Sequence, residues 1–214
     1  MIAETKKSQS AVNCNLHLNE TLRIIYSRRA VRQYTDKPVD RKVIELIIDA
    51  GRMAPSAMNN QPWRFYVLTG REIIRNFSKQ IGKASIHGIS QMGVKRIARS
   101  VASALFHPAD LRFFKGDDFI FHGAPVVIFI TAPKEYEWAG LDIGACAQNM
   151  MLAAKALGLD SCPVGLAKFV ADTAIFSTLN VPEKDQVLLS VIIGYADESP
   201  GMHERKRDNL IFIG

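Results

Sequence analysis

The segment from Trp138 to Leu157 constrains the fold more than any other part of the chain. It is mostly apolar and is followed by Gly158, a residue type that commonly ends helices. A helix that is apolar on nearly all sides must be buried on nearly all sides. In a chain of 214 residues, a subunit interface can supply part of that burial. Small residues that allow close helix approach recur through it: Gly140, Gly144, Ala145, Ala147, Ala153, Ala154 and Ala156.

Helical and strand patterns alternate irregularly along the rest of the chain. Helical spacing predicts helices over residues 19–29, 40–51, 71–80 and 170–179, and Asn19 and Asp40 are expected to cap the first two. Apolar and β-branched runs predict strands over residues 65–69, 125–131, 186–195 and 209–213. The order contains no strict βαβ repeat, so it favours an α+β fold over a doubly wound sheet.

Length and hydropathy predict one domain over residues 18–214, preceded by a flexible segment over residues 1–17. Residues 85–122 give the weakest pattern, and a long segment of this kind is often a lid or an insertion at a binding site. No apolar run reaches the roughly 20 residues that span a bilayer, and the first residues lack the core of a signal peptide. We therefore expect a cytoplasmic protein that does not enter a membrane.

Charge and cysteine usage exclude several other functions. The formal net charge is +6, but the basic residues form two clusters and not a stripe interleaved with aromatic residues, which disfavours nucleic acid. Three cysteines without close spacing and five scattered histidines predict neither a disulfide framework nor a metal site. The glycine motifs of dinucleotide-binding and P-loop proteins are also missing from the sequence. No catalytic group can be paired from spacing, which favours an enzyme that takes its chemistry from a cofactor.

Three arginines fall within five residues at the end of the first predicted helix: Arg28, Arg29 and Arg32. Guanidinium groups bind phosphate oxygens through paired, charge-assisted hydrogen bonds, so this cluster can surround one phosphate. The alternative is that the arginines stabilise the negative end of the helix dipole and hold surface carboxylates. The sequence leaves both interpretations open.

A polar loop with the sequence Pro-Ser-Ala-Met-Asn-Asn-Gln-Pro occupies residues 55–62. Its hydroxyl and amide groups suit a flat heterocycle or a ribityl chain, although an ordinary turn before a strand has the same composition. Residues 163–165 read as a turn in which Gly165 lets a ligand approach the backbone. Arg205 and Arg207 would point the same way from an extended segment, or form a solvated tail.

The order of these motifs resembles the nitroreductase family over roughly residues 18–214. It comprises Arg-Arg-x-x-Arg, Ala-Pro-Ser-x-x-Asn-x-Gln-Pro-Trp-x-Phe, Gly-Ala-Pro-Val-Val-Ile, the helix with Gln-Asn-Met, Gly-Leu-x-x-Cys-Pro-x-Gly, Ile-Gly-Tyr and Arg-x-Arg. The resemblance implies an α+β fold with a central antiparallel sheet flanked by helices. It also implies an intertwined homodimer that holds FMN between its two subunits.

The resemblance also implies roles for individual residues in binding FMN. The phosphate and ribityl chain would be held by Arg28, Arg29, Arg32, Arg205 and Arg207. The loop residues Pro55, Ser56, Ala57 and Asn59 would reach the flavin of the other subunit, and Pro163, Val164 and Gly165 would lie near its reactive nitrogen. The family often has serine at the position of Ala30, where a backbone contact can survive.

The resemblance implies chemistry carried by the flavin, with no catalytic side chain and no metal. NADH or NADPH would reduce FMN and leave, and a small organic acceptor such as a nitroaromatic or a quinone would then take the electrons. Two alternatives remain open at this point. One is another flavin reaction, such as dehydrogenation or reductive removal of a halogen, and the other is a flavin-binding protein without turnover.

Overall fold

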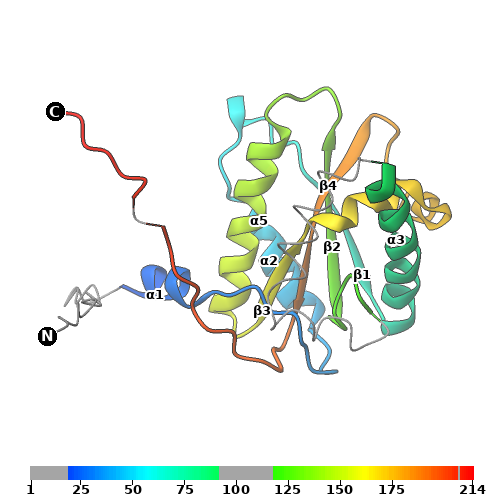
Figure 1. Cartoon of the computed structure of the whole chain (residues 1–214), viewed down its shortest axis with the longest axis horizontal. Coiled ribbons are helices and arrows are strands. Elements are labelled where there is room, and N and C mark those ends of the chain that lie inside the picture. The colour runs from blue at the N-terminus through cyan, green and yellow to red at the C-terminus, as the bar shows by residue number, and fades with distance from the viewer. Residues whose placement is uncertain (1–18, 92–117, 207) are drawn as a thin grey trace, which may run out of the picture.

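A computed structural model describes residues 19–91, 118–206 and 208–214, and it contains a four-stranded antiparallel sheet with helices on both faces (Figure 1). The strand order is β1-β2-β4-β3. This architecture confirms the predicted α+β class. The elements in chain order are α1 (Glu20–Ser27), α2 (Arg41–Arg52), η1 (Ala57–Asn59), β1 (Arg64–Thr69), α3 (Arg71–Gln91), β2 (Val126–Pro133), α5 (Ala139–Ala156), β3 (Asp160–Val164), η3 (Gly165–Asp172), η4 (Ala174–Leu179) and β4 (Asp185–Gly194).

Polar side chains start the first two helices where the sequence predicts them. The Asn19 side chain accepts a hydrogen bond from the Leu22 N–H at 3.0 Å, and Asp40 accepts one from the Lys42 N–H at 2.7 Å. Each bond satisfies a backbone donor that has no partner within its helix. Both predicted N-caps are therefore confirmed.

The central strand β2 separates two hydrophobic cores. Ile128 and Ile130 face the core under α2 and α5, whereas Val127 and Phe129 face the core under α3 and η3. Successive side chains of a strand point to opposite faces, so a strand covered on both faces must be apolar throughout. This explains the unbroken apolar run that predicted a buried strand here.

Helix α5 is buried on one side only within a single chain. Ala147 is 1% exposed and faces its own core, whereas Leu141, Gly144 and Gln148 lie on an exposed face. The predicted helix is confirmed. Within the chain it packs closely on α2, because a Cβ added at Gly51 would lie 2.6 Å from Met150 Cγ. The exposed face is the part that one chain does not cover.

Four local predictions were wrong. Helix α3 is longer than predicted and includes residues 81–87, which the sequence pattern did not identify as helical. Residues 170–179 form parts of two 3-10 helices in place of one α-helix, and residues 209–213 form no strand in this chain. Pro163 and Val164 belong to strand β3 and not to a turn. Proline is tolerated there because β3 lies at the edge of the sheet.

The end of the chain runs away from the body of the molecule, as Figure 1 shows. Its last residues include four exposed apolar side chains, and Phe212 is 89% exposed. Within the described ranges, no helix is both long and apolar enough to cross a membrane, and no cluster of His, Cys, Asp and Glu could hold a metal ion. The predicted flexible segment over residues 1–17 and residues 92–117 of the predicted lid lie outside the described residues.

Candidate functional site

The arginine segment, residues 28–32, lies along the start of edge strand β3. Ala30 pairs with Ser161 in a parallel bridge, and the Val31 N–H donates to the Ser161 carbonyl at 3.1 Å. Helix α1 ends before this segment, and the backbone of Arg28 is already extended. The segment is therefore held by β3, which brings two of the motifs found in the sequence side by side.

Arg28 and Arg32 both lie close to the Cys162 sulfur. Burial raises the pKa of the Cys162 thiol, and the positive charges of Arg32 and Arg28 oppose that rise. The Arg32 backbone N–H also donates to the Glu198 carboxylate, which fixes the segment against the chain that follows β4. The charges of two guanidinium groups thus act on one sulfur of β3, and a pair of such groups suits a phosphate. Cys162 belongs to the Gly-Leu-x-x-Cys-Pro-x-Gly motif, whereas Glu198 carries no sequence signal that would have identified it.

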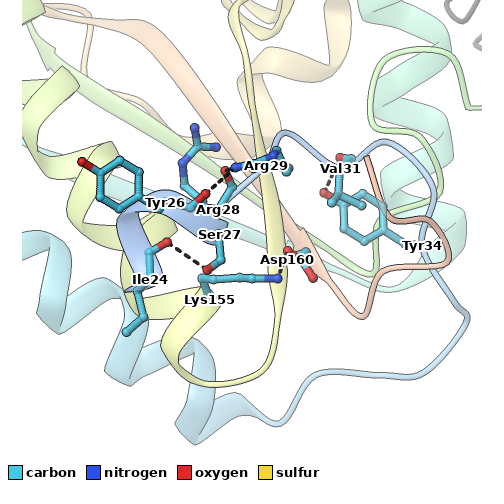
Figure 2. A network of polar contacts seen from close by, with 9 residues as sticks. All are labelled: Ile24, Tyr26, Ser27, Arg28, Arg29, Val31, Tyr34, Lys155 and Asp160. Atoms are coloured by element: carbon cyan, nitrogen blue, oxygen red, sulfur yellow. Dashed lines mark hydrogen bonds and ion pairs between the residues drawn. The ribbon is translucent and has the colours of Figure 1, made fainter. Parts of the chain in front are cut away.

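Arg29 has a different environment from its neighbours. Its Nη1 donates to the carbonyl oxygens of Tyr26 and Arg28, both at 2.8 Å, so its side chain folds back over the end of α1 (Figure 2). This is the helix-end role that the sequence left open as an alternative. Its Nε is buried and has no hydrogen-bond partner in the described part of the chain. By donating to the Arg28 carbonyl, Arg29 therefore holds the backbone of the arginine segment in place.

Residues 163–165 lie at the far end of β3 and lead into η3. Pro163 and Gly165 are exposed, whereas Val164 is buried. A Cβ added at Gly165 would meet no atom within 4 Å, so packing inside the chain does not require glycine there. The open space beside this backbone would admit a flat ligand.

The loop over residues 55–61 has an unusual backbone. Met58, Asn59 and Gln61 all have positive φ angles, of 54°, 55° and 45°. The Ser56 hydroxyl oxygen accepts a hydrogen bond from the Gln61 N–H at 2.9 Å, which closes the loop. The Met58 side chain is 92% exposed, so the tip of the loop points away from its own chain. The amides of this loop are therefore available to a ligand or a second copy.

The loop and the arginine segment lie at opposite ends of α5 (Figure 1). The loop contacts the first turn of the helix through Asp142, whereas β3, which carries the arginine segment, follows its last turn. An 18-residue helix is about 27 Å long. The loop and the arginine segment therefore lie well apart within one chain (Figure 1).

The predicted basic tail contributes less to this geometry. Arg205 is exposed, and its Nη1 donates only to the nearby His203 carbonyl, at 3.1 Å. Arg207 lies outside the described residues. Among the described residues, no contact joins Arg205 to Arg28 or Arg32.

A separate cleft of about 810 Å³ opens on the other side of Arg32. Its walls include Arg71, Arg75 and His122. Burial lowers the pKa of His122 to about 4, and the Arg32 charge adds to that effect, so the ring is neutral at pH 7. Of the described residues that are predicted to bind FMN, only Arg32 borders this cleft.

A model of the Nitroreductase family matches residues 25–195 of the chain. The chain belongs to the nitroreductase family. The match spans the arginine segment, the polar loop and residues 163–165, so the resemblance seen in the motifs is confirmed. Membership also assigns the protein to the oxidoreductases of this family.

Individual relatives of this nitroreductase are similar over most of their length. A 4-nitrobenzoate reductase from Pseudomonas putida is 34% identical over 198 residues, which cover 82% of this chain and 85% of the relative. A chloronitrobenzene nitroreductase from Comamonas testosteroni is 30% identical over 207 residues, covering 85% and 88%. The crystal structure of a nitroreductase with bound FMN from Bacteroides fragilis has a TM-score of 0.72 and 25% identity, and the match covers 92% of this chain and all of that one.

Proposed function

We propose that this protein is an FMN-dependent oxidoreductase that uses NADH or NADPH to reduce nitroaromatic or quinone acceptors. The observation that carries the proposal is that the charges of Arg28 and Arg32 both act at Cys162 of β3, in a chain of the nitroreductase family. The Bacteroides fragilis neighbour binds FMN, and the Pseudomonas putida relative is named for reduction of a nitroaromatic acid. Bound FMN would supply the redox chemistry by accepting electrons from the nicotinamide and passing them to the second substrate.

The described residues fit the parts of FMN. Arg28 and Arg32 would bind the phosphate, and Arg29 would hold the Arg28 backbone in place. Ala30, which bridges to Ser161, can contribute its backbone but no side-chain hydrogen bond. The tail arginines, Arg205 and Arg207, remain predicted partners of the phosphate or ribityl chain. All of these groups bind and orient the cofactor.

Residues 163–165 would line the reactive edge of the flavin ring. The open space beside Gly165 lets the ring approach the backbone, and a backbone N–H of this segment could donate to the reactive nitrogen. Such a bond would stabilise the charge that develops during reduction. No side chain of the chain is assigned as an acid, base or nucleophile.

We infer that the active form is an intertwined homodimer. Since the loop and the arginine segment lie at opposite ends of α5 (Figure 1), the residues Pro55, Ser56, Ala57 and Asn59 would reach the flavin held by a second copy. The exposed face of α5 and the apolar tail over residues 210–213 would pack against that copy. The tail would there acquire the partners that it lacks in one chain.

Reduction of the bound flavin tests this function directly. The yellow protein is mixed with NADPH or with NADH under argon, and its visible absorbance is followed by stopped flow. Fast bleaching, with recovery on adding 4-nitrobenzoate, supports the proposal. Bound FMN that neither nucleotide bleaches would favour a flavin protein with another reaction or without turnover, and a protein that binds no flavin would contradict the proposal.

A further inference from the structure

We propose that Asp142 and Tyr136 form a clamp that sets the shape of the 55–61 loop and so positions Ser56 and Asn59 for the flavin of the opposite subunit. The inference rests on the proposed function, because it assigns a positioning role within that FMN site. Neither Asp142 nor Tyr136 belongs to the sequence motifs that are expected to bind FMN.

The clamp is centred on a buried carboxylate. Asp142 is 3% exposed and lies in the first turn of α5. Its two oxygens lie 3.3 Å from the Ala57 backbone nitrogen and accept its N–H, and one of them accepts the Tyr136 hydroxyl at 2.7 Å. Burying a carboxylate is costly unless hydrogen bonds satisfy it, and the start of a helix favours a negative charge. The Ala57 N–H, the Tyr136 hydroxyl and the start of the helix therefore all stabilise this carboxylate.

Tyr136 connects the same carboxylate to the loop from a second side. Its hydroxyl oxygen lies 2.7 Å from Asp142 and 3.3 Å from the Ala57 carbonyl oxygen, so one hydroxyl is placed against both. Burial and the hydrogen bond to Asp142 raise the pKa of Tyr136, so the phenol stays protonated as a donor. Ala57 is thus held at both its N–H and its carbonyl.

The loop needs such support because its backbone is strained. Three of the four residues from Met58 to Gln61 adopt left-handed conformations, which are costly for residues other than glycine and persist only when their surroundings fix them. The residues that follow Ala57 are exposed, and their other support comes from hydrogen bonds within the loop and from the contact of Asn60 with Tyr136. The hydrogen bonds of Asp142 and Tyr136 to Ala57 are therefore the anchor of the loop. They position Ser56 and Asn59 for the flavin of the opposite subunit.

Two variants test the clamp, with one matched control. Asp142→Asn keeps the shape of the side chain but removes the charge, and Tyr136→Phe keeps the ring but removes the hydroxyl. Glu137→Gln removes a charge from an exposed position of the same connection. We expect FMN affinity to fall about 10-fold in Asp142→Asn and about 3-fold in Tyr136→Phe, as expected for lost charged and neutral hydrogen bonds, and to stay unchanged in the control.

A heterodimer experiment separates positioning across the interface from a merely structural role. Arg28→Ala and Asp142→Asn chains are co-expressed with different affinity tags, and the mixed dimer is isolated by tandem purification. One site of this dimer combines the intact arginines of one chain with the intact loop of the other. We expect that site to bind one FMN per dimer with wild-type affinity, although both homodimers bind weakly.

Each outcome decides the inference. Weak binding at every site of the mixed dimer would mean that the loop acts within its own chain, and wild-type affinity in the Asp142→Asn homodimer would mean that the clamp does not position it. If Asp142→Asn does not fold, Tyr136→Phe replaces it in the same pairing. A wild-type protein that binds no FMN would overturn the proposed function as well, whereas failure of the mixed dimer alone would leave that function standing.

Discussion

Replacing Arg28 by alanine should affect a different property from replacing Arg29, although the two residues are neighbours. The Arg28 guanidinium makes no hydrogen bond or ion pair within the described ranges, and its charge acts on Cys162 beside β3. Arg29 instead donates to two carbonyl oxygens at the end of α1. We therefore expect Arg28→Ala to change cofactor binding and Arg29→Ala to change mainly the stability of the fold.

The magnitudes follow from these contacts. A hydrogen bond to a charged group contributes about 1.5–3 kcal/mol, so Arg28→Ala should weaken FMN binding about 10- to 100-fold. Arg29→Ala removes one exposed and one partly buried bond, each contributing about 0.5–1.5 kcal/mol, and should lower the free energy of unfolding by about 1–3 kcal/mol. For a domain of this size, each kcal/mol of lost stability lowers Tm by about 2–4 °C.

Two measurements on the same preparations separate these effects. FMN titration of the apoproteins, followed by flavin fluorescence, gives the dissociation constants, and thermal unfolding of the apoproteins gives Tm. The account predicts a large change in affinity only for Arg28→Ala. Wild-type FMN affinity in Arg28→Ala would place the phosphate elsewhere, and equal losses of Tm in both variants would refute the distinction between the two side chains.

Three further substitutions test other parts of the structure. A Cβ in Gly194→Ala would lie 2.6 Å from Pro125 Cδ and 2.8 Å from Tyr34 Cδ1, so urea denaturation should show a loss of about 1–3 kcal/mol; an unchanged midpoint would contradict this packing. The folded pKa of His122, about 4, lies below the unfolded value of about 6.5, so unfolding takes up a proton in this window and stability should fall by about 1–3 kcal/mol as pH drops from 7 to 4. His122→Asn, which suits the left-handed backbone at this position, should remove that part of the dependence in denaturation curves at several pH values; an unchanged curve would refute it. Gly144→Arg should abolish the dimer and FMN binding in light scattering, because Gly144 is exposed in one chain but faces the proposed interface, and a variant that stays dimeric with FMN bound would move the interface away from α5.

The sequence predicted elements whose signals are local. Asn19 and Asp40 begin their helices because each cap needs only the next few residues, and β2 was evident because a strand buried on both faces is apolar throughout. Strand β3 was missed because Pro163 and Gly165 are typical of turns. Proline is acceptable in β3 only because the strand lies at the edge of the sheet, a fact that depends on the tertiary fold.

The same limit applies to the candidate site. The motif order identified the arginine segment and the polar loop, but it could not separate Arg28 from Arg29, because their partners differ only in three dimensions. Asp142 lies 85 positions from Ala57 along the chain, and Glu198 lies 166 from Arg32. No pattern in one sequence links residues so far apart. The tail over residues 209–213 has a strand-like composition but forms no strand with the described part of this chain.

The central claim is that FMN binds between two copies of this chain, and one measurement tests it most directly. The purified protein is passed over a size-exclusion column with light scattering and absorbance at flavin wavelengths, and the flavin released on denaturation is identified by mass. The account predicts a single dimeric peak that carries one FMN per chain. A monomer that retains FMN, a dimer that releases FAD, or a protein that stays colourless after incubation with FMN would contradict it.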